Sequence, residues 1–329
     1  MRIHGCWIQV LLCMICLALD VGAIELRMGL PLPFESKEWT IAAKGAERMS
    51  QAPTGEVSVV LVPSEKDGPS IAAQLQRGEL EGGLVIMQDF GTLSLGQDAF
   101  TYALPCTFMS TNEVFHIREK LDATLLQKLS EGPYEAVAIV GFGAAYAMST
   151  QALSTPADWR ERKIWIPSGD AFIQNFNMLN LQTVSTSVKD VRARLKSGLL
   201  DTIIVPPTVA VMKRWHTRVR NVFDAPFVYT YGIWVLRDDV LERLSEADQK
   251  GVLKHLSVLC QELDDAIQGR NTKAREVLNR YGVAFLAPNA AMKEQWSHWA
   301  DALWLGLEAS QKPSLALHNA LKEHLENNR

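Results

Sequence analysis

The chain has 329 residues, of which 47% are hydrophobic and 21% charged, and its formal net charge is −4. This is an ordinary globular composition, long enough for two domains of common size. Nothing in the charge balance indicates nucleic acid or an anionic membrane surface as a partner, since either would need a clustered basic face. Three of the five cysteines lie within the first 16 residues. Only Cys106 and Cys260 then remain, either as one disulfide or as two buried thiols.

The N-terminus has the pattern of a secretory signal. Arg2 precedes an apolar run over residues 8–19, and the small residues at 21–23 resemble a cleavage site. The apolar run is shorter than the roughly 20 residues that a bilayer span requires. We therefore expect residues 1–23 to be a signal peptide and the mature chain to be a soluble protein of the periplasm.

Strand-like and helical segments alternate along the first two thirds of the chain. The predicted strands are 24–29, 57–62, 82–87, 136–141, 164–166 and 202–205. The predicted helices between them include 38–49, 70–77, 111–129 and 188–197. Strands separated by helices favour parallel α/β sheets.

The last third of the chain has longer helical patterns. Ser245 is a capping residue, and the pattern after it runs to about Arg280 and stops at Gly282. A helix of that length exceeds the usual globular range, so we expect it to bridge two lobes. A short strand over 283–286 and another helix from about Pro288 complete the pattern.

One segment resembles a cofactor-binding turn. A strand leads into Gly141-Phe142-Gly143, but the sixth position of the dinucleotide fingerprint is Tyr146, where glycine or alanine is needed, and residues 149–156 are loop-like. We interpret the segment as a turn at the end of a strand. The alternative is an exported oxidoreductase that binds a nucleotide there. Because no nucleophile elbow, phosphate loop or metal-ligand spacing is found, we expect a binding protein without a cofactor rather than an enzyme.

An exported chain with two α/β lobes and no catalytic set is typical of ligand capture. Two lobes that close over a ligand are a known hinge architecture, and the ligand lies at the carboxyl ends of the strands. We expect the chain to cross between lobes near 146–151 and 229–232. The expected lobes are 24–147 with about 230–258 for lobe I, and 148–229 with about 259–329 for lobe II.

Several stretches resemble one family in their order and spacing. They are "LRMGLPLP", "GEVSVVLVPSEKDGPSIAAQLQRGELEGG", "YALPCTF", "STPADWRERKIWIP", "DVRARLKSGLLDT" and "VFDAPFVYTYGIWVLRDDVLERLSEADQKGVL". Together they resemble the solute-binding subunit of tripartite ATP-independent periplasmic (TRAP) transporters, the DctP type, over roughly Ile24 to Pro288. The resemblance implies two α/β lobes, a long helix that crosses both, a small-molecule ligand in the cleft, and an integral membrane permease that receives it.

Most members of that family bind organic acids, with an arginine in a strand written "KIRVP" that pairs with the ligand carboxylate. In this chain the strand is 163–167, and the arginine is replaced by Trp165. Two further polar ligand positions of the family fall at Ala145 and Val205. Because a buried carboxylate left unpaired costs several kcal/mol, these differences predict a neutral or mainly apolar ligand. In this interpretation Trp165 faces the cleft; the alternative is that it packs between the lobes without touching the ligand.

Other positions extend the apolar trend. Pro31 and Met87 lie near cleft-lining positions of the family, and Tyr146 and Tyr229 lie at the expected crossovers. The candidate ligand residues are therefore Trp165, Ala145, Val205, Tyr146, Met87, Pro31 and Tyr229. Two alternative functions stay open: an organic acid bound through other basic residues, such as Lys163, Arg27, Arg192 or Arg214, and an envelope protein that keeps the fold without transport.

Overall fold

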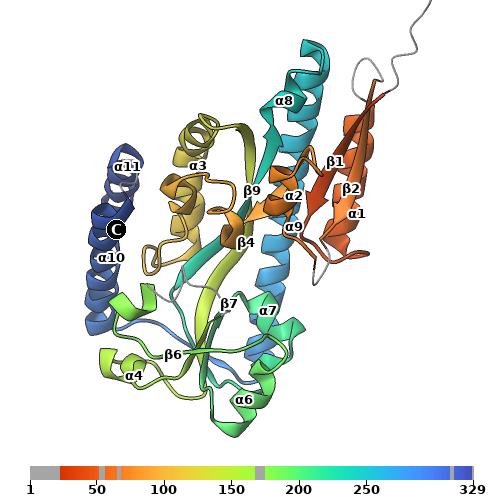
Figure 1. The fold of residues 1–329 in the computed structure, drawn as a ribbon. Helices are drawn as coiled ribbons and strands as arrows, with labels where there is room; N and C mark the ends of the chain where they lie inside the picture. The colour runs from red at the N-terminus through yellow and green to blue at the C-terminus, as the bar shows by residue number, and fades with distance from the viewer. Residues whose placement is uncertain (1–22, 52–55, 65–67, 167–174, 312–314, 328–329) are drawn as a thin grey trace, which may run out of the picture.

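The computed structural model describes residues 23–51, 56–64, 68–166, 175–311 and 315–327. The predicted signal peptide therefore lies almost entirely outside the described residues. The chain forms two lobes, one above the other in Figure 1. None of the helices in the described ranges is both long and apolar enough to span a bilayer. Cys106 and Cys260 are buried as free thiols rather than as a disulfide.

Lobe I contains three parallel strands that are connected through helices, and two long strands shared with the crossing between lobes complete its sheet. The strand order in this lobe is β2-β1-β3-β9-β4, in which β9 is Val228–Arg237 and β4 is Tyr134–Ser149, and β1 pairs in parallel with both β2 and β3. Its strands, apart from β4 and β9, are β1 (Ile24–Leu30), β2 (Val57–Pro63) and β3 (Gly82–Ile86). Its helices are α1 (Lys37–Ser50), α2 (Ile71–Gln76), the 3₁₀ turns η1 (Met87–Asp89) and η2 (Gln97–Phe100), and α3 (Thr111–Leu129).

Lobe II repeats this plan on a smaller scale. Strand β5 pairs in parallel with β6 on one side and β7 on the other. Its strands are β5 (Ile164–Ile166), β6 (Thr183–Ser185), β7 (Thr202–Val205), β8 (Asn221–Phe223) and β10 (Ala284–Leu286). Its helices are α4 (Pro156–Arg160), α6 (Val191–Ser197), α7 (Pro207–Met212) and η3 (Trp215–Thr217).

Two long strands join the lobes. Strand β4 (Tyr134–Ser149) pairs with β9 (Val228–Arg237) as far as Ala145 and then with β7 from Tyr146 onward. Strand β4 therefore leaves the lobe I pairing at Ala145 and enters the lobe II pairing at Tyr146, and β9 begins its pairing with β4 at Val228. The predicted strand-end turn at 141–143 is wrong, because β4 continues through these residues and absorbs them as a register shift.

The long helix α9 (Glu246–Arg280) runs beside both lobes (Figure 1). The side chain of Ser245 caps its first turn by accepting the backbone N–H of Asp248. In lobe I the helix packs against α1, and in lobe II it packs against α7. Helix α8 (Asp238–Leu241) leads into it from β9. The predicted two-lobed α/β fold with a bridging helix is confirmed.

The C-terminal helices α10 (Ala290–Gln311) and α11 (Leu315–Glu326) cover one side of the molecule. Helix α11 packs against α3 of lobe I. Helix α10 contacts lobe II through an aromatic cluster in which Trp296 and Trp299 both lie edge-on to Trp159. The indole N–H of Trp296 also donates to the carbonyl oxygen of Phe108 in lobe I, 3.3 Å away. This helix therefore contacts both lobes.

We expect the packing of α11 on α10 to weaken in acid because of His318. This residue is 3% exposed and its ring lies against Trp304. Burial, followed by the charge of Lys322, lowers the pKa of His318 from 6.5 to about 4, and Asp301 opposes the shift. The unfolded chain takes up this proton first as the pH falls, so the stabilisation is complete above about pH 6.5 and is lost progressively towards pH 4.

Thermal unfolding between pH 7.5 and pH 4.5 measures this effect. The melting temperature should fall less steeply over that interval in His318→Leu than in the unchanged protein, because leucine does not titrate. An identical pH dependence in both proteins would show that His318 does not carry the effect.

Candidate ligand-binding cleft between the lobes

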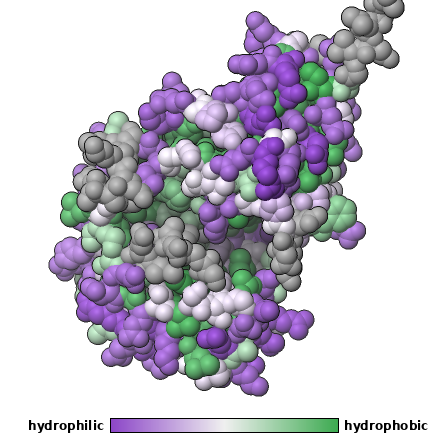
Figure 2. Space-filling view, viewed as in Figure 1, coloured by the Kyte–Doolittle hydropathy of each residue, from purple (hydrophilic) through white to green (hydrophobic). Residues whose placement is uncertain are grey.

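The carboxyl ends of the parallel strands of the two lobes lie toward each other. From lobe I, the chain leaves β1 at Pro31 and leaves β3 at Met87. From lobe II, it leaves β7 at Val205. Figure 2 shows the surface hollowed between the lobes. This is the position at which open α/β sheets hold ligands.

Trp165 is buried within lobe II, in the middle of β5. It is 4% exposed, and its indole N–H donates to the backbone carbonyl oxygen of Thr186, 3.0 Å away. The ring lies edge-on to Trp215, with the ring centroids 5.1 Å apart. Lys163, on the same face of the predicted alternation, is exposed and donates to the carbonyl oxygen of Gly198. The only hydrogen-bond donor of the Trp165 side chain is therefore already used inside the lobe.

Val205 and Tyr146 are brought together by strand pairing. They are aligned partners on β7 and β4, so their side chains share one face of the sheet. The Tyr146 hydroxyl lies 2.8 Å from the hydroxyl of Thr111, and the guanidinium of Arg275 lies over its ring at 5.0 Å. Burial raises the pKa of Tyr146. Ala145, the preceding residue along β4, is 2% exposed and pairs with Val228 of β9.

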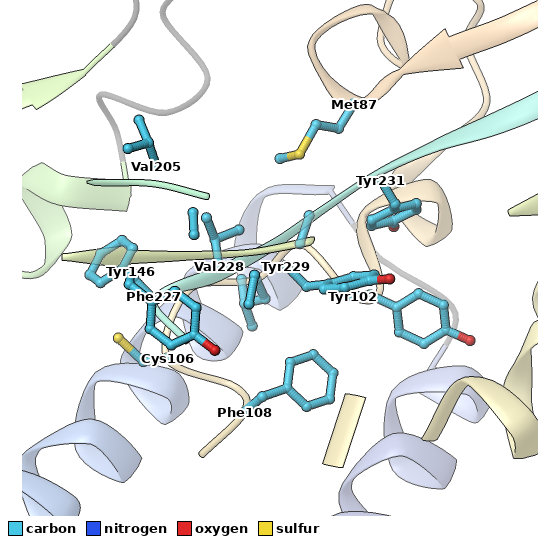
Figure 3. Packing of buried hydrophobic residues seen from close by; sticks show 14 of the residues in the cluster. Met87, Tyr102, Cys106, Phe108, Tyr146, Val205, Phe227, Val228, Tyr229 and Tyr231 are labelled. Carbon is cyan, nitrogen blue, oxygen red and sulfur yellow. The ribbon is translucent and has the colours of Figure 1, made fainter. Parts of the chain in front are cut away.

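Met87 reaches from lobe I toward lobe II. Figure 3 shows its thioether directed to the side on which Val205 lies. Both side chains are buried, and both belong to one hydrophobic cluster that extends through the two lobes. Pro31 is half-buried at the end of β1. Pro31, Met87 and Val205 therefore lie at or beside strand ends. Met87 and Val205 are apolar side chains from opposite lobes.

Tyr229 does not join the residues at the strand ends. It is fully buried, and its hydroxyl accepts a hydrogen bond of 2.9 Å from Nη1 of Arg118 on α3. Burial raises the pKa of Tyr229. The Tyr229 hydroxyl is therefore directed at the helices behind β4 and β9, the two strands that join the lobes and are called the hinge strands below. It belongs to a buried polar network.

That buried network consists of Arg118, Asp122, Tyr229 and Asp264, and it holds the backbone of Gly141. Nη1 of Arg118 lies 2.7 Å from Oδ2 of Asp264, and the N–H of Gly141 donates to Oδ1 of the same carboxylate at 3.0 Å. Asp122 forms a second ion pair with Arg118 at 3.1 Å. Burial opposes the charge of Arg118, but the surrounding tyrosine and carboxylates outweigh it and raise the pKa of the guanidinium. The network is a structural support for the hinge strands.

The four basic residues that the sequence offered for an organic acid lie on the surface. Arg27, Lys163, Arg192 and Arg214 are all exposed. A separate open groove of about 490 Å³ lies between α1 and β2, and none of the seven predicted ligand residues lines it. The exposed position of these four cations therefore places none of them beside Trp165, which is buried, and the groove belongs to a different part of the molecule.

A family model described as bacterial extracellular solute-binding protein, family 7 (DctP), matches residues 35–311. This chain belongs to that family. DctP proteins are solute-binding receptors rather than enzymes, and they bind small molecules and work with TRAP membrane permeases. No curated protein matches this chain.

Solved structures of TRAP periplasmic solute-binding proteins share the fold of this DctP protein. An apo, open one from Rhodobacter sphaeroides is 17% identical, with a TM-score of 0.78 over 93% of this chain and 99% of that one. One from Ochrobactrum anthropi, with its C-terminus bound in the ligand-binding pocket, is 14% identical, with a TM-score of 0.81 over 94% and 97%. One from Shewanella oneidensis, with bound succinate, is 14% identical, with a TM-score of 0.73 over 94% and 100%.

Sequence reasoning missed the residues that support the hinge of this DctP protein. Arg118 lies among the buried apolar positions of α3, and Asp264 lies among those of α9. A charge on the apolar face of an amphipathic helix is the signal that could have drawn attention to both, because such a charge needs a buried partner. The pattern does not say which of the other charges is that partner.

Proposed function

We propose that this DctP protein captures a neutral or mainly apolar small molecule between its lobes and delivers it to a TRAP-type membrane permease. Family membership supports the receptor role. The ligand class rests on Trp165, which the family resemblance places at the position of the arginine of acid-binding members. Its indole N–H is already bonded to the carbonyl oxygen of Thr186, so no donor of this side chain remains for a carboxylate.

The neighbouring strand ends favour the same ligand class. Met87 and Val205 are apolar, and Ala145 carries no polar side chain. Burying apolar ligand surface against such groups contributes about 25 cal/mol per Å². A carboxylate placed among them would lose its hydration at a cost of several kcal/mol, and the cation over Tyr146, Arg275, is already paired with Asp224.

A second candidate is an organic acid held by other basic residues. The specific observation in its favour is that related structures contain acids, among them succinate, L-gulonate and D-glucuronate. Exposed cations of lobe II, such as Arg192 and Arg214, would then turn toward the ligand. A third possibility, an envelope protein that retains the fold without transport, requires that no small molecule binds.

Calorimetry on the mature protein, freed of any co-purified molecule by unfolding and refolding, separates these candidates. We expect saturable binding to a sterol-like lipid and none to succinate or D-glucuronate; a fatty acid, which is apolar but carries a carboxylate, should bind more weakly than the sterol-like lipid. Native mass spectrometry of protein taken from its own periplasm should show a bound mass without an acid group. Tight binding of a short dicarboxylate would overturn the apolar assignment, and the lack of any bound molecule would favour the envelope protein.

The variant Trp165→Arg tests whether the ligand contacts residue 165. We expect it to weaken binding of the apolar ligand by at least tenfold, because it places a cation among buried side chains and removes the ring from Trp215. Trp165→Phe, which keeps an aromatic ring but loses the N–H and the five-membered part of the indole, is the control without a charge and should bind more nearly as the unchanged protein does. Circular dichroism must show that both variants are folded. Equal affinity in Trp165→Arg and Trp165→Phe would mean that the ligand does not contact this position.

A further inference from the structure

Helix α9 contacts the hinge strand β4 at two points that are seven residues apart on the helix. Oδ1 of Asp264 accepts the N–H of Gly141 at 3.0 Å, and Nδ2 of Asn271 donates to the carbonyl oxygen of Phe142 at 2.9 Å. Seven residues are about two turns of α-helix, so both side chains lie on one face of α9. The helix therefore binds two consecutive residues of the strand.

Asn271 also reaches the first turn of α7 in lobe II. Its Oδ1 accepts the backbone N–H of Thr208 at 3.3 Å and a second hydrogen bond from the hydroxyl of the same residue. Thr208 follows Val205 by only three residues, and Val205 ends β7 at the cleft. One amide side chain thus joins the hinge strand to the cleft wall of lobe II.

The hinge strand is shaped to admit this amide. Gly143 has a φ of +107°, and a Cβ at this position would lie 2.3 Å from Nδ2 of Asn271. The register between β4 and β9 shifts between Gly141 and Gly143, and the hydroxyl of Thr230 on β9 donates to the carbonyl oxygen of Gly143 at 2.7 Å. A bulge of this kind is where a strand bends most readily.

We propose that Asn271 is a positioning residue for ligand capture, which fixes the lobe II cleft wall to α9 and concentrates lobe movement at the β4 bulge. With the amide in place, α7 and the adjoining part of α9 move as one body, and the bend is confined to the bulge at 141–143. Without it, the wall that carries Val205 moves independently of the hinge. The proposal rests on the two-lobed receptor architecture and not on the identity of the ligand.

The test is a ligand-free measurement of the distance between the lobes. Spin labels on exposed positions of α3 and α6, introduced by Lys120→Cys and Lys196→Cys, report the distance distribution by pulsed electron paramagnetic resonance. The native thiols, Cys106 and Cys260, are buried. We expect Asn271→Ala to broaden or shift the distribution. Thr272→Ala, an exposed neighbour on α9 whose hydroxyl bonds only within the helix, should leave it unchanged.

A second pair of variants keeps the test decisive if Asn271→Ala fails to fold. Thr208→Val has the same shape but loses the hydroxyl, whereas Thr208→Ser keeps both donors to Asn271. Thr208→Val should shift the distance distribution and raise amide exchange in α7 about five-fold, which corresponds to the loss of one hydrogen bond. Thr208→Ser should resemble the unchanged protein. Unchanged distances and exchange in Thr208→Val would overturn the proposal, whatever ligand the protein binds.

Discussion

Replacing Asp264 with alanine should lower the free energy of unfolding by about 3–5 kcal/mol, because it leaves the Arg118 guanidinium buried without its closest counter-ion. Both side chains are more than nine-tenths buried, and their charged atoms lie 2.7 Å apart. The same change removes the acceptor for the N–H of Gly141. Urea unfolding at pH 7, followed by far-ultraviolet circular dichroism, gives the measurement.

The matched control removes both charges. In the double variant Arg118→Leu with Asp264→Leu, neither member of the pair is left as a buried charge, although Asp122, which is partly exposed, also loses Arg118. The loss should therefore be smaller than the sum of the losses in Arg118→Leu and Asp264→Leu alone. Asp122→Ala, which removes the more exposed partner, should cost less than Asp264→Ala. A loss below about 1 kcal/mol in Asp264→Ala would contradict a supporting role for this ion pair.

The succession of strands and helices could be predicted because each segment carries its own periodicity. Helix α3 and strand β7 have the predicted bounds, since capping and apolar runs mark their ends. Strand β4 could not be predicted in full. Glycines at 141 and 143 are as typical of a turn as of a bulge, and only the pairing of β4 with β9 and β7 decides between the two.

The same distinction decides how far the sequence places the candidate residues. Strand ends are local features, so the positions of Pro31, Met87 and Val205 at or beside strand ends follow from the apolar runs, whereas their assignment to the cleft comes from the family resemblance. The orientation of Tyr229 could not, because its hydroxyl bonds to a guanidinium 111 positions earlier in the chain. Trp165 could be predicted only in part. Its strand was predicted, but its hydrogen bond to the backbone of Thr186 depends on the pairing of β5 with β6.

Replacing Gly141 with alanine should lower the free energy of unfolding by about 1–3 kcal/mol through overpacking. A Cβ at this position would lie 1.9 Å from the hydroxyl oxygen of Tyr229 and 2.8 Å from Oδ1 of Asp264. Neither atom can retreat easily, because the hydroxyl and the carboxylate are both bonded to Arg118. Urea unfolding should therefore show a lower midpoint at an unchanged slope.

A second substitution should restore part of that loss. Tyr229→Phe removes the oxygen that meets the new Cβ first, so Gly141→Ala should cost less in the Tyr229→Phe background than in the unchanged protein, although the phenylalanine itself forfeits the hydrogen bond from Arg118. Gly269→Ala is the matched control, since a Cβ added to this exposed glycine of α9 would meet no atom within 4 Å. It should stabilise the helix by about 0.5–1 kcal/mol. An equal cost of Gly141→Ala in both backgrounds would show that the Tyr229 hydroxyl does not limit the space beside the hinge strand.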